Sequence, residues 1–203
     1  MTRAFFLALL LIRTLPAVTQ IVGDRVDKYV AQNFIDTFIV YSFPCSGYIS
    51  FLDSCRNDVS HYLFWRQNES YLLKRFDYCK TYQTLTLDTV NPLAFYLTNE
   101  HIINEEQIRQ PTYYEVKKNK KTVDTLMYIL TESHPCYHTF KFSFTNKPKY
   151  KSAAIYYLEF EMLDNEKKNI YYNYNQKTKF KSLIDLTIKL IKQLETENKF
   201  EIE

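Results

Sequence analysis

Glycine is nearly absent from this sequence: Gly23 and Gly47 are the only two among 203 residues. Phosphate-binding loops, dinucleotide-binding fingerprints and nucleophile elbows each need several closely spaced glycines, because the backbone must turn tightly or approach a ligand. The sequence therefore excludes these three kinds of site. An excess of one charge is also lacking, since 26 basic residues stand against 23 acidic ones. This balance gives no general attraction to nucleic acid or to an anionic membrane surface, and we expect no nucleic-acid partner.

Aromatic residues are abundant, with 18 tyrosines and 15 phenylalanines. Aromatic side chains favour β-strands. Hydrophobic residues make up 46% of the chain and charged residues 24%, which is typical of a soluble globular protein. The chain has no internal repeat and no linker rich in proline, serine or glycine. These features predict one domain, which we assign to residues 20–203.

The N-terminus has the pattern of a secretory signal peptide. Arg3 precedes an unbroken apolar run, Ala4–Ile12, and small residues follow it. The run is too short for a membrane-spanning helix, which needs about 20 apolar residues. We predict removal of residues 1–19; cleavage after Ala17 is an alternative, and Arg13 leaves an uncleaved anchor open. The mature chain is expected to be periplasmic or extracellular and to lack a membrane span.

Four cysteines, Cys45, Cys55, Cys79 and Cys136, form an even set in a chain predicted to be exported. Oxidising compartments favour disulfides, so we predict two of them. Four cysteines allow three pairings. We favour Cys45–Cys55, which closes a local loop, together with Cys79–Cys136, which joins two distant strands.

The first half of the chain combines both periodicities. Apolar residues at helical spacing predict a helix over residues 24–39. The end of this helix is left open, because Phe38–Tyr41 also fits the start of a strand. A period of two then predicts a β-hairpin whose turn contains Asn68. The hairpin strands are expected at 61–66 and 70–76, a further strand at 82–87, and a helix in two short pieces at 93–109.

The second half predicts more strands and a final helix. Strands are expected at 122–131, 137–145, 153–163 and 169–173, joined by short turns as antiparallel neighbours. The basic cluster Lys117–Lys121 is interpreted as a solvated loop, the alternative being contact with a phosphate or an acidic polymer. A helix from Ser182 presents one apolar face, formed by Leu183, Ile184, Thr187, Leu190, Ile191 and Leu194. Residues after Glu195 are expected to add little stability, although Phe200 and Ile202 have the character to dock.

These elements predict an α+β fold. It consists of a twisted antiparallel sheet of about six to seven strands, with the N-terminal and C-terminal helices packed on one side.

Several segments resemble a known group of proteins. They are Tyr62–Tyr71 and Lys74–Cys79 in the hairpin, His134-Pro135-Cys136, and Tyr172–Asn175 before the last helix. Together they are similar to uncharacterised small exported proteins of AT-rich bacteria of the flavobacterial kind. The resemblance implies an exported, disulfide-bonded α+β domain and carries no assigned activity.

One cluster has metal-ligand chemistry. On an extended segment His134, Cys136 and His138 project from the same face, and two imidazoles with a thiolate suit zinc or copper. This spacing covers about 13 Å on a straight strand, too far for one ion unless Pro135 bends the chain. Cys136 is also needed for a disulfide, so the alternative is a disulfide flanked by two ordinary histidines. His101 is a further candidate ligand; we expect no cofactor.

Tyrosines form the second candidate site. Tyr156, Tyr157, Tyr171, Tyr172 and Tyr174 lie on two predicted neighbouring strands, where exposed rings stack on sugars or peptides. Cross-strand packing within the protein is the alternative interpretation.

The sequence favours an exported, non-enzymatic domain that binds another envelope or secreted protein or a polysaccharide, or that serves structurally in the envelope. One alternative is a small hydrolase or metal-dependent enzyme centred on His134 and His138. Another is an inhibitor or immunity-type protein that binds through an aromatic sheet face.

Overall fold

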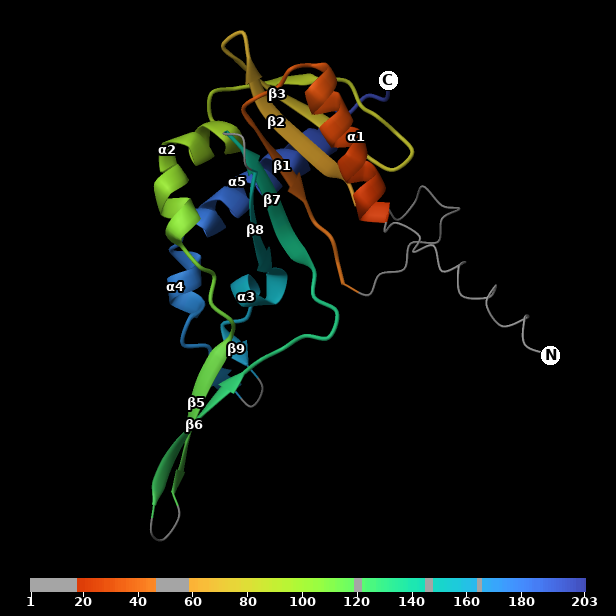
Figure 1. Cartoon of the computed structure of the whole chain (residues 1–203). Helices are drawn as coiled ribbons and strands as arrows, with labels where there is room; N and C mark the ends of the chain where they lie inside the picture. The colour runs from red at the N-terminus through yellow and green to blue at the C-terminus, as the bar shows by residue number, and fades with distance from the viewer. Residues whose placement is uncertain (1–17, 47–58, 119–121, 145–147, 164–165) are drawn as a thin grey trace, which may run out of the picture.

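A computed structural model describes residues 18–46, 59–118, 122–144, 148–163 and 166–203 (Figure 1). Its centre is a six-stranded antiparallel sheet in the order β4-β3-β2-β1-β7-β8. The strands are β1 Phe38–Ser42, β2 His61–Gln67, β3 Ser70–Phe76, β4 Leu85–Leu87, β7 Tyr137–Ser143 and β8 Lys149–Ala154. Two separate two-stranded sheets consist of β5 Thr112–Lys118 with β6 Val123–Ile129, and β9 Met162–Leu163 with β10 Lys167–Lys168.

Five helices in the described part of the chain accompany these sheets. They are α1 Val18–Gln32, α2 Pro92–Glu105, α3 Ile155–Glu159, α4 Tyr172–Gln176 and α5 Lys179–Thr196. The predicted α+β class with an antiparallel sheet and terminal helices is confirmed. Within the described ranges, no helix has the length and apolar character needed to cross a membrane.

Helices cover both faces of the central sheet, and the prediction that they share one side is wrong. Val22 and Val26 of α1 pack with Leu63 and Trp65 on one face. The opposite face packs against α2 and α5 in a larger core (Figure 1). The reason lies in the central strand β1, Phe-Ile-Val-Tyr-Ser, in which all five residues are buried. A strand that is apolar on both sides needs cover on both sides.

The boundary between α1 and β1 resolves an alternative that the sequence left open. The helix ends at Gln32, six residues before β1 begins at Phe38. Phe38–Tyr41 is therefore strand and not the last turn of a helix. Phe34, between them, has a φ of 52°, so the chain reverses through the left-handed region before it enters the sheet.

The predicted hairpin at β2 and β3 is confirmed. Its two turn residues, Asn68 and Glu69, have φ values of 48° and 65°. Two positive φ values in a row are typical of the type I′ turn, whose twist matches that of antiparallel strands. The strand predicted at 82–87 is shorter in the structure, where β4 spans Leu85–Leu87.

The predicted two-part helix at 93–109 is one helix, α2. Asn91 caps it, because the side-chain oxygen of Asn91 accepts a hydrogen bond of 3.0 Å from the backbone N–H of Ala94. Pro92 stands in the first turn, where its missing N–H costs nothing.

The C-terminal helix α5 buries the face that the sequence predicts. Leu183, Ile184, Thr187 and Ile191 are buried, and Leu190 and Leu194 pack against the same core. The helix begins at Lys179, earlier than the predicted Ser182, because Thr178 is the N-cap and accepts a hydrogen bond of 3.1 Å from Lys181 N–H.

Replacement of Ile191 by alanine should lower the free energy of unfolding by about 2–3 kcal/mol. The change removes buried methyl groups and leaves a cavity against the sheet. Urea unfolding followed by circular dichroism measures the loss, and Lys189→Ala, an exposed position on the same helix, is the matched control. An unchanged midpoint for Ile191→Ala would show that the helix is not packed on the sheet in solution.

Two predicted strands in the second half are wrong. The segment predicted as one strand at 153–163 is strand only at its two ends, in β8 and β9, and forms α3 between them. Residues 169–173 lead into α4. Side chains take the hydrogen bonds that a strand ladder would use, since the Asn175 amide donates 2.8 Å bonds to the carbonyl oxygens of Arg109 and Tyr157. Tertiary contacts therefore override the strand preference of the local sequence. The strands predicted at 122–131 and 137–145 correspond to β6 and β7.

Candidate functional site

A long β-hairpin projects from the body of the protein. Strands β5 and β6 each contain seven residues and pair over their whole length, from Thr112 opposite Ile129 to Lys118 opposite Val123. Figure 1 shows strands β5 and β6 extending away from the central sheet. In the described part of the chain these two strands pair only with each other.

One face of this hairpin is largely apolar and exposed, with Thr125 and Lys118 as its polar members. Side chains alternate between the two faces of a strand, and the pairing register places Tyr114, Val116, Met127 and Ile129 on the same face, with Val123 near the tip. Each of these five side chains exposes between 46% and 66% of its surface. We call this group the apolar hairpin face: Tyr114, Val116, Val123, Met127 and Ile129.

The opposite face of the hairpin has a different character. Tyr113 and Tyr128 stack there, with ring centroids 4.9 Å apart, and Lys117 lies opposite Asp124. A hydrogen bond with Tyr128 raises the pKa of Lys117. Charged and mutually packed side chains, together with one exposed leucine, Leu126, occupy this face, whereas the exposed side chains of the apolar hairpin face are predominantly apolar.

The base of the hairpin is fixed by one buried asparagine. The side-chain oxygen of Asn169 accepts hydrogen bonds from Thr112 N–H at 3.2 Å and Tyr171 N–H at 3.0 Å. Its amide donates to the carbonyl oxygen of Phe160 at 2.9 Å. The backbone adds a 2.9 Å bond from Ile170 N–H to Thr112 O. These contacts hold the first residue of β5 against the body, so the hairpin has a defined direction.

The tyrosines predicted as a binding site lie near this base, on two adjacent short helices instead of on strands. Tyr156 is buried, Tyr174 is exposed, and Tyr157, Tyr171 and Tyr172 are half-buried. The Arg109 guanidinium lies 5.5 Å and 5.8 Å from the ring centres of Tyr171 and Tyr174. Tyr157 accepts a 2.7 Å hydrogen bond from Gln110. Most of these rings are thus engaged within the protein, and the ladder of exposed rings that the sequence favours is not formed.

The histidines predicted as metal ligands occupy different environments. His138 is buried on β7, and its Nδ1 shares a hydrogen bond of 2.9 Å with the Tyr41 hydroxyl. His134 is exposed beside Ser133, and His101 is exposed on α2, where it lies 3.2 Å from Glu105. Among the described residues, no group of three or more His, Cys, Asp or Glu side chains is placed to hold a metal ion.

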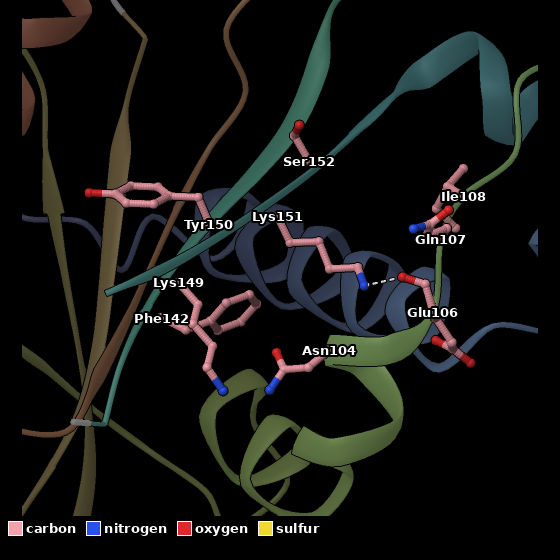
Figure 2. Close-up of a pocket in the computed structure, with 9 residues that line it drawn as sticks. All are labelled: Asn104, Glu106, Gln107, Ile108, Phe142, Lys149, Tyr150, Lys151 and Ser152. Carbon is pink, nitrogen blue, oxygen red and sulfur yellow. Dashed lines mark hydrogen bonds between the residues drawn. The ribbon is translucent and has the colours of Figure 1, made fainter. Parts of the chain in front are cut away.

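A surface pocket of about 740 Å³ lies between β8 and the end of α2. Figure 2 shows Lys151 pointing from β8 toward this helix end, while Tyr150 points away from it. The Lys151 ammonium donates hydrogen bonds to the carbonyl oxygens of Ile103 and Glu106, which lack partners further along the helix. Burial lowers the pKa of Lys151. The second lysine of the pocket, Lys149, has its ammonium 3.3 Å from the Glu100 carboxylate. Both cations are therefore engaged within the protein, and we assign the pocket no ligand.

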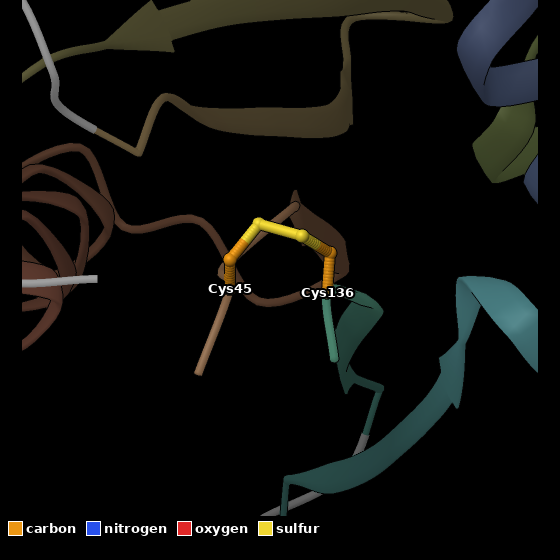
Figure 3. The surroundings of a disulfide bond; sticks show 2 residues. All are labelled: Cys45 and Cys136. Carbon is orange, nitrogen blue, oxygen red and sulfur yellow. A yellow bond between two sulfur atoms is a disulfide. The ribbon is translucent and has the colours of Figure 1, made fainter. Parts of the chain in front are cut away.

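The disulfide pairing differs from the prediction. Cys45 is bonded to Cys136 across 91 residues (Figure 3), so the predicted pairs Cys45–Cys55 and Cys79–Cys136 are both wrong. Cys79 is also disulfide-bonded, and Cys55 lies outside the described residues.

The physical reason is the sheet order. β1 and β7 are antiparallel neighbours, so the segment that follows β1 meets the segment that precedes β7. Backbone hydrogen bonds of 2.8 Å from Ser46 N–H to Pro135 O and from Tyr137 N–H to Pro44 O flank the bond. This adjacency joins residues that are remote in sequence, and no local pattern reveals it.

Comparison with known proteins gives no match: no family model fits the sequence, and no curated protein and no solved structure is similar to it.

Sequence reasoning missed the hairpin. Strand β5 was not predicted, because its last residues begin the basic cluster that was interpreted as a loop. Lys117 and Lys118 are in fact in β5. Residues 119–121 lie outside the described part. A signal was present in Tyr114 and Val116, which alternate with Glu115 and Lys117 at the strand period. The exposure of the apolar hairpin face, in contrast, follows only from the pairing of β5 with β6 and from their distance from the core.

Proposed function

We propose that this protein is an exported, non-enzymatic binding protein, and that it holds another secreted or envelope protein against the apolar hairpin face. The observation that supports the proposal is the exposure of five apolar side chains on one face of a projecting two-stranded sheet. Monomeric soluble proteins rarely expose large contiguous apolar patches, and such patches mark interaction sites. A two-stranded sheet is also marginally stable by itself, so a partner on its apolar face would stabilise it.

Export is the second part of the proposal. It is supported by the N-terminal pattern of Arg3, the apolar run Ala4–Ile12 and Ala17, and by the Cys45–Cys136 disulfide, which suits an oxidising compartment. The resemblance to exported flavobacterial proteins of no assigned activity agrees with it and remains a prediction.

The mature protein is therefore expected to begin between Val18 and Ile21. Mass spectrometry of the protein recovered from the periplasm or the culture medium measures this directly. A membrane-bound chain that still begins at Met1 would contradict cleavage and support an anchor instead.

The binding site is tested by photo-crosslinking in the exporting cell. A benzophenone amino acid at Met127, on the apolar hairpin face, should cross-link one protein species, which mass spectrometry identifies. The same probe at Leu126, its exposed neighbour on the opposite face, is the matched control and should not.

The identified protein is then purified and its affinity is measured by calorimetry. The double variant Val116→Ser with Met127→Ser should weaken binding at least about tenfold, because it removes two central apolar contacts. Leu126→Ser should leave the affinity within about twofold. Equal affinity for the double variant, or equal cross-linking from both faces, would refute the assignment of this face.

A further inference from the structure

The outer edge of β5 has backbone groups that point away from β6. In an antiparallel pair, hydrogen-bonded residues alternate with residues whose N–H and C=O face outward. The hydrogen bond of 2.9 Å from Leu130 N–H to Pro111 O shows which residues of β5 bond to β6. They are every second residue from Pro111: Tyr113, Glu115 and Lys117. The groups of Tyr114, Val116 and Lys118 then face outward.

The base of the hairpin independently confirms which residues of β5 direct their backbone groups outward. The outward groups of Thr112 are both used by the body of the protein, since Ile170 N–H donates to Thr112 O and Thr112 N–H donates to Asn169 Oδ1. Beyond this point, no described strand pairs with the outer edge of β5. An edge of this kind is a template for adding another strand.

The charges on β5 favour one register for pairing this edge with the same edge of a second copy. Glu115 and Lys117 stand on either side of Val116 and on the same face. If two copies of β5 run antiparallel about a twofold axis at Val116, Glu115 of each copy lies opposite Lys117 of the other. Opposite charges in directly facing positions stabilise a sheet, and like charges destabilise it.

Other registers are worse for the same reason. A shift of two residues in one direction places Glu115 opposite Glu115, and in the other direction Lys117 opposite Lys117. A shift of one residue brings inward-facing backbone groups to the new edge and mismatches the two faces. The outer edge of β6 has no such pattern, because its one charged residue, Asp124, would face an uncharged residue when the axis lies at Thr125.

We propose that the partner of the β5 edge is a second copy of this chain, paired about Val116 to form a four-stranded sheet in the order β6-β5-β5-β6. The outward groups of Tyr114, Val116 and Lys118 bond to those of Lys118, Val116 and Tyr114 of the second copy. The strands run in opposite directions, so the two bodies lie at opposite ends of the new sheet.

The pairing has a consequence for each face of the sheet. Lys117 gains a second carboxylate, Glu115 of the other copy, beside Asp124 of its own hairpin. On the other side the two apolar hairpin faces meet at the axis, because Tyr114 and Val116 keep their side in both copies, and Lys118 of each copy lies opposite Tyr114 of the other. The proposal goes beyond the proposed function, since it concerns the strand edge and not the apolar face.

Charge-swap variants test the proposal. Sedimentation velocity of the purified mature protein from about 1 to 200 µM should show a concentration-dependent dimer. Glu115→Lys places lysine opposite lysine at two points of the sheet, and Lys117→Glu places glutamate opposite glutamate. Each change should raise the dimer dissociation constant at least about tenfold.

A mixture gives the decisive result. An equimolar mixture of the Glu115→Lys and Lys117→Glu proteins should associate again, because every facing pair then has opposite charges. Glu132→Lys, which makes the same change of net charge at an exposed site outside the hairpin, should dimerise as the unaltered protein does. Unchanged thermal midpoints will show that each variant is folded.

Three outcomes would overturn the proposal: an unaltered protein that is monomeric throughout, a Glu115→Lys protein that still dimerises, or a mixture that does not associate. A cysteine at the axis adds a geometric check. Val116→Cys should form a disulfide-linked dimer, and Thr125→Cys, its neighbour on β6, should not; the reverse would also overturn the pairing. An unaltered protein that stays monomeric but still binds its partner refutes only this pairing. An unaltered protein that dimerises but binds no partner at the apolar hairpin face refutes only the proposed function.

Discussion

A decrease in pH from 7 to 5 should lower the free energy of unfolding by about 4 kcal/mol through two buried histidines, His61 and His138. Burial lowers the pKa of both residues from 6.5 to about 4. For His61, Asp27 and Asp77 oppose this shift and Lys141 adds to it. For His138, Asp185 opposes it and Lys181 adds to it.

The sign follows from proton binding. Between pH 6.5 and pH 4 the unfolded chain binds protons at these two imidazoles and the folded protein does not, so acid favours unfolding. The stabilisation is complete above pH 6.5 and is lost as the pH falls toward 4, by about 2 kcal/mol for each histidine at pH 5. Buried neutral imidazoles are part of the folded core: His138 packs against Phe43 with ring centroids 4.7 Å apart.

Urea unfolding at several pH values measures the effect. His138→Gln should remove about half of the pH dependence between pH 7 and pH 5, whatever its effect on stability at pH 7. Thr86→Ala, at an exposed position that carries no titratable group, is the control and should leave the pH dependence unchanged. If His138→Gln unfolds with the same pH dependence as the unaltered protein, the histidine is not buried neutral.

Removal of Phe200–Glu203 should cost about 3–5 kcal/mol of stability. The ammonium of Lys74, a side chain only 2% exposed, pairs with the Glu203 carboxylate and donates a 2.7 Å hydrogen bond to Tyr82 O. Ile202 forms a strand bridge with Tyr82, and Phe200 packs against the core. Deletion leaves a buried cation without its carboxylate and exposes apolar surface.

This expected cost differs from the prediction made from the sequence, in which residues after Glu195 contribute little to the free energy of unfolding. A double-mutant cycle separates the two causes. Lys74→Met removes the buried charge, so the same deletion should cost at least about 1 kcal/mol less in the Lys74→Met protein than in the unaltered one. Equal costs in both backgrounds, measured by urea unfolding, would show that Lys74 does not depend on the C-terminal segment.

Local patterns were sufficient for the elements that local forces determine. The β2–β3 hairpin was predicted because Asn68 begins a two-residue turn between alternating strands, and that turn fixes the register by itself. The buried face of α5 was predicted because apolar residues repeat at helical spacing. The α+β class followed from the same two periodicities.

The candidate site was less accessible to sequence reasoning. The tyrosines were identified as a group, and the two helices on which they lie are adjacent. The prediction that they lie on strands was wrong, because buried Asn175 directs the chain through side-chain hydrogen bonds that leave no periodic pattern in the sequence. The apolar hairpin face was missed because an apolar side chain such as Val116 or Met127 has the same sequence signature in a core as on a projecting hairpin.

The sequence by itself determined the class of the fold and the absence of glycine-dependent catalytic loops, since each depends on composition or on residues within a few positions of one another. Only the tertiary structure decided the Cys45–Cys136 disulfide, the helices on both sides of the sheet and the docking of Glu203 on Lys74. The disulfide joins residues 91 positions apart, and the Lys74–Glu203 pair joins residues 129 positions apart. Such contacts are set by the order in which strands pair and by the burial that follows. A local pattern records the preference of a segment for helix or strand, whereas the partner of that segment depends on the whole chain.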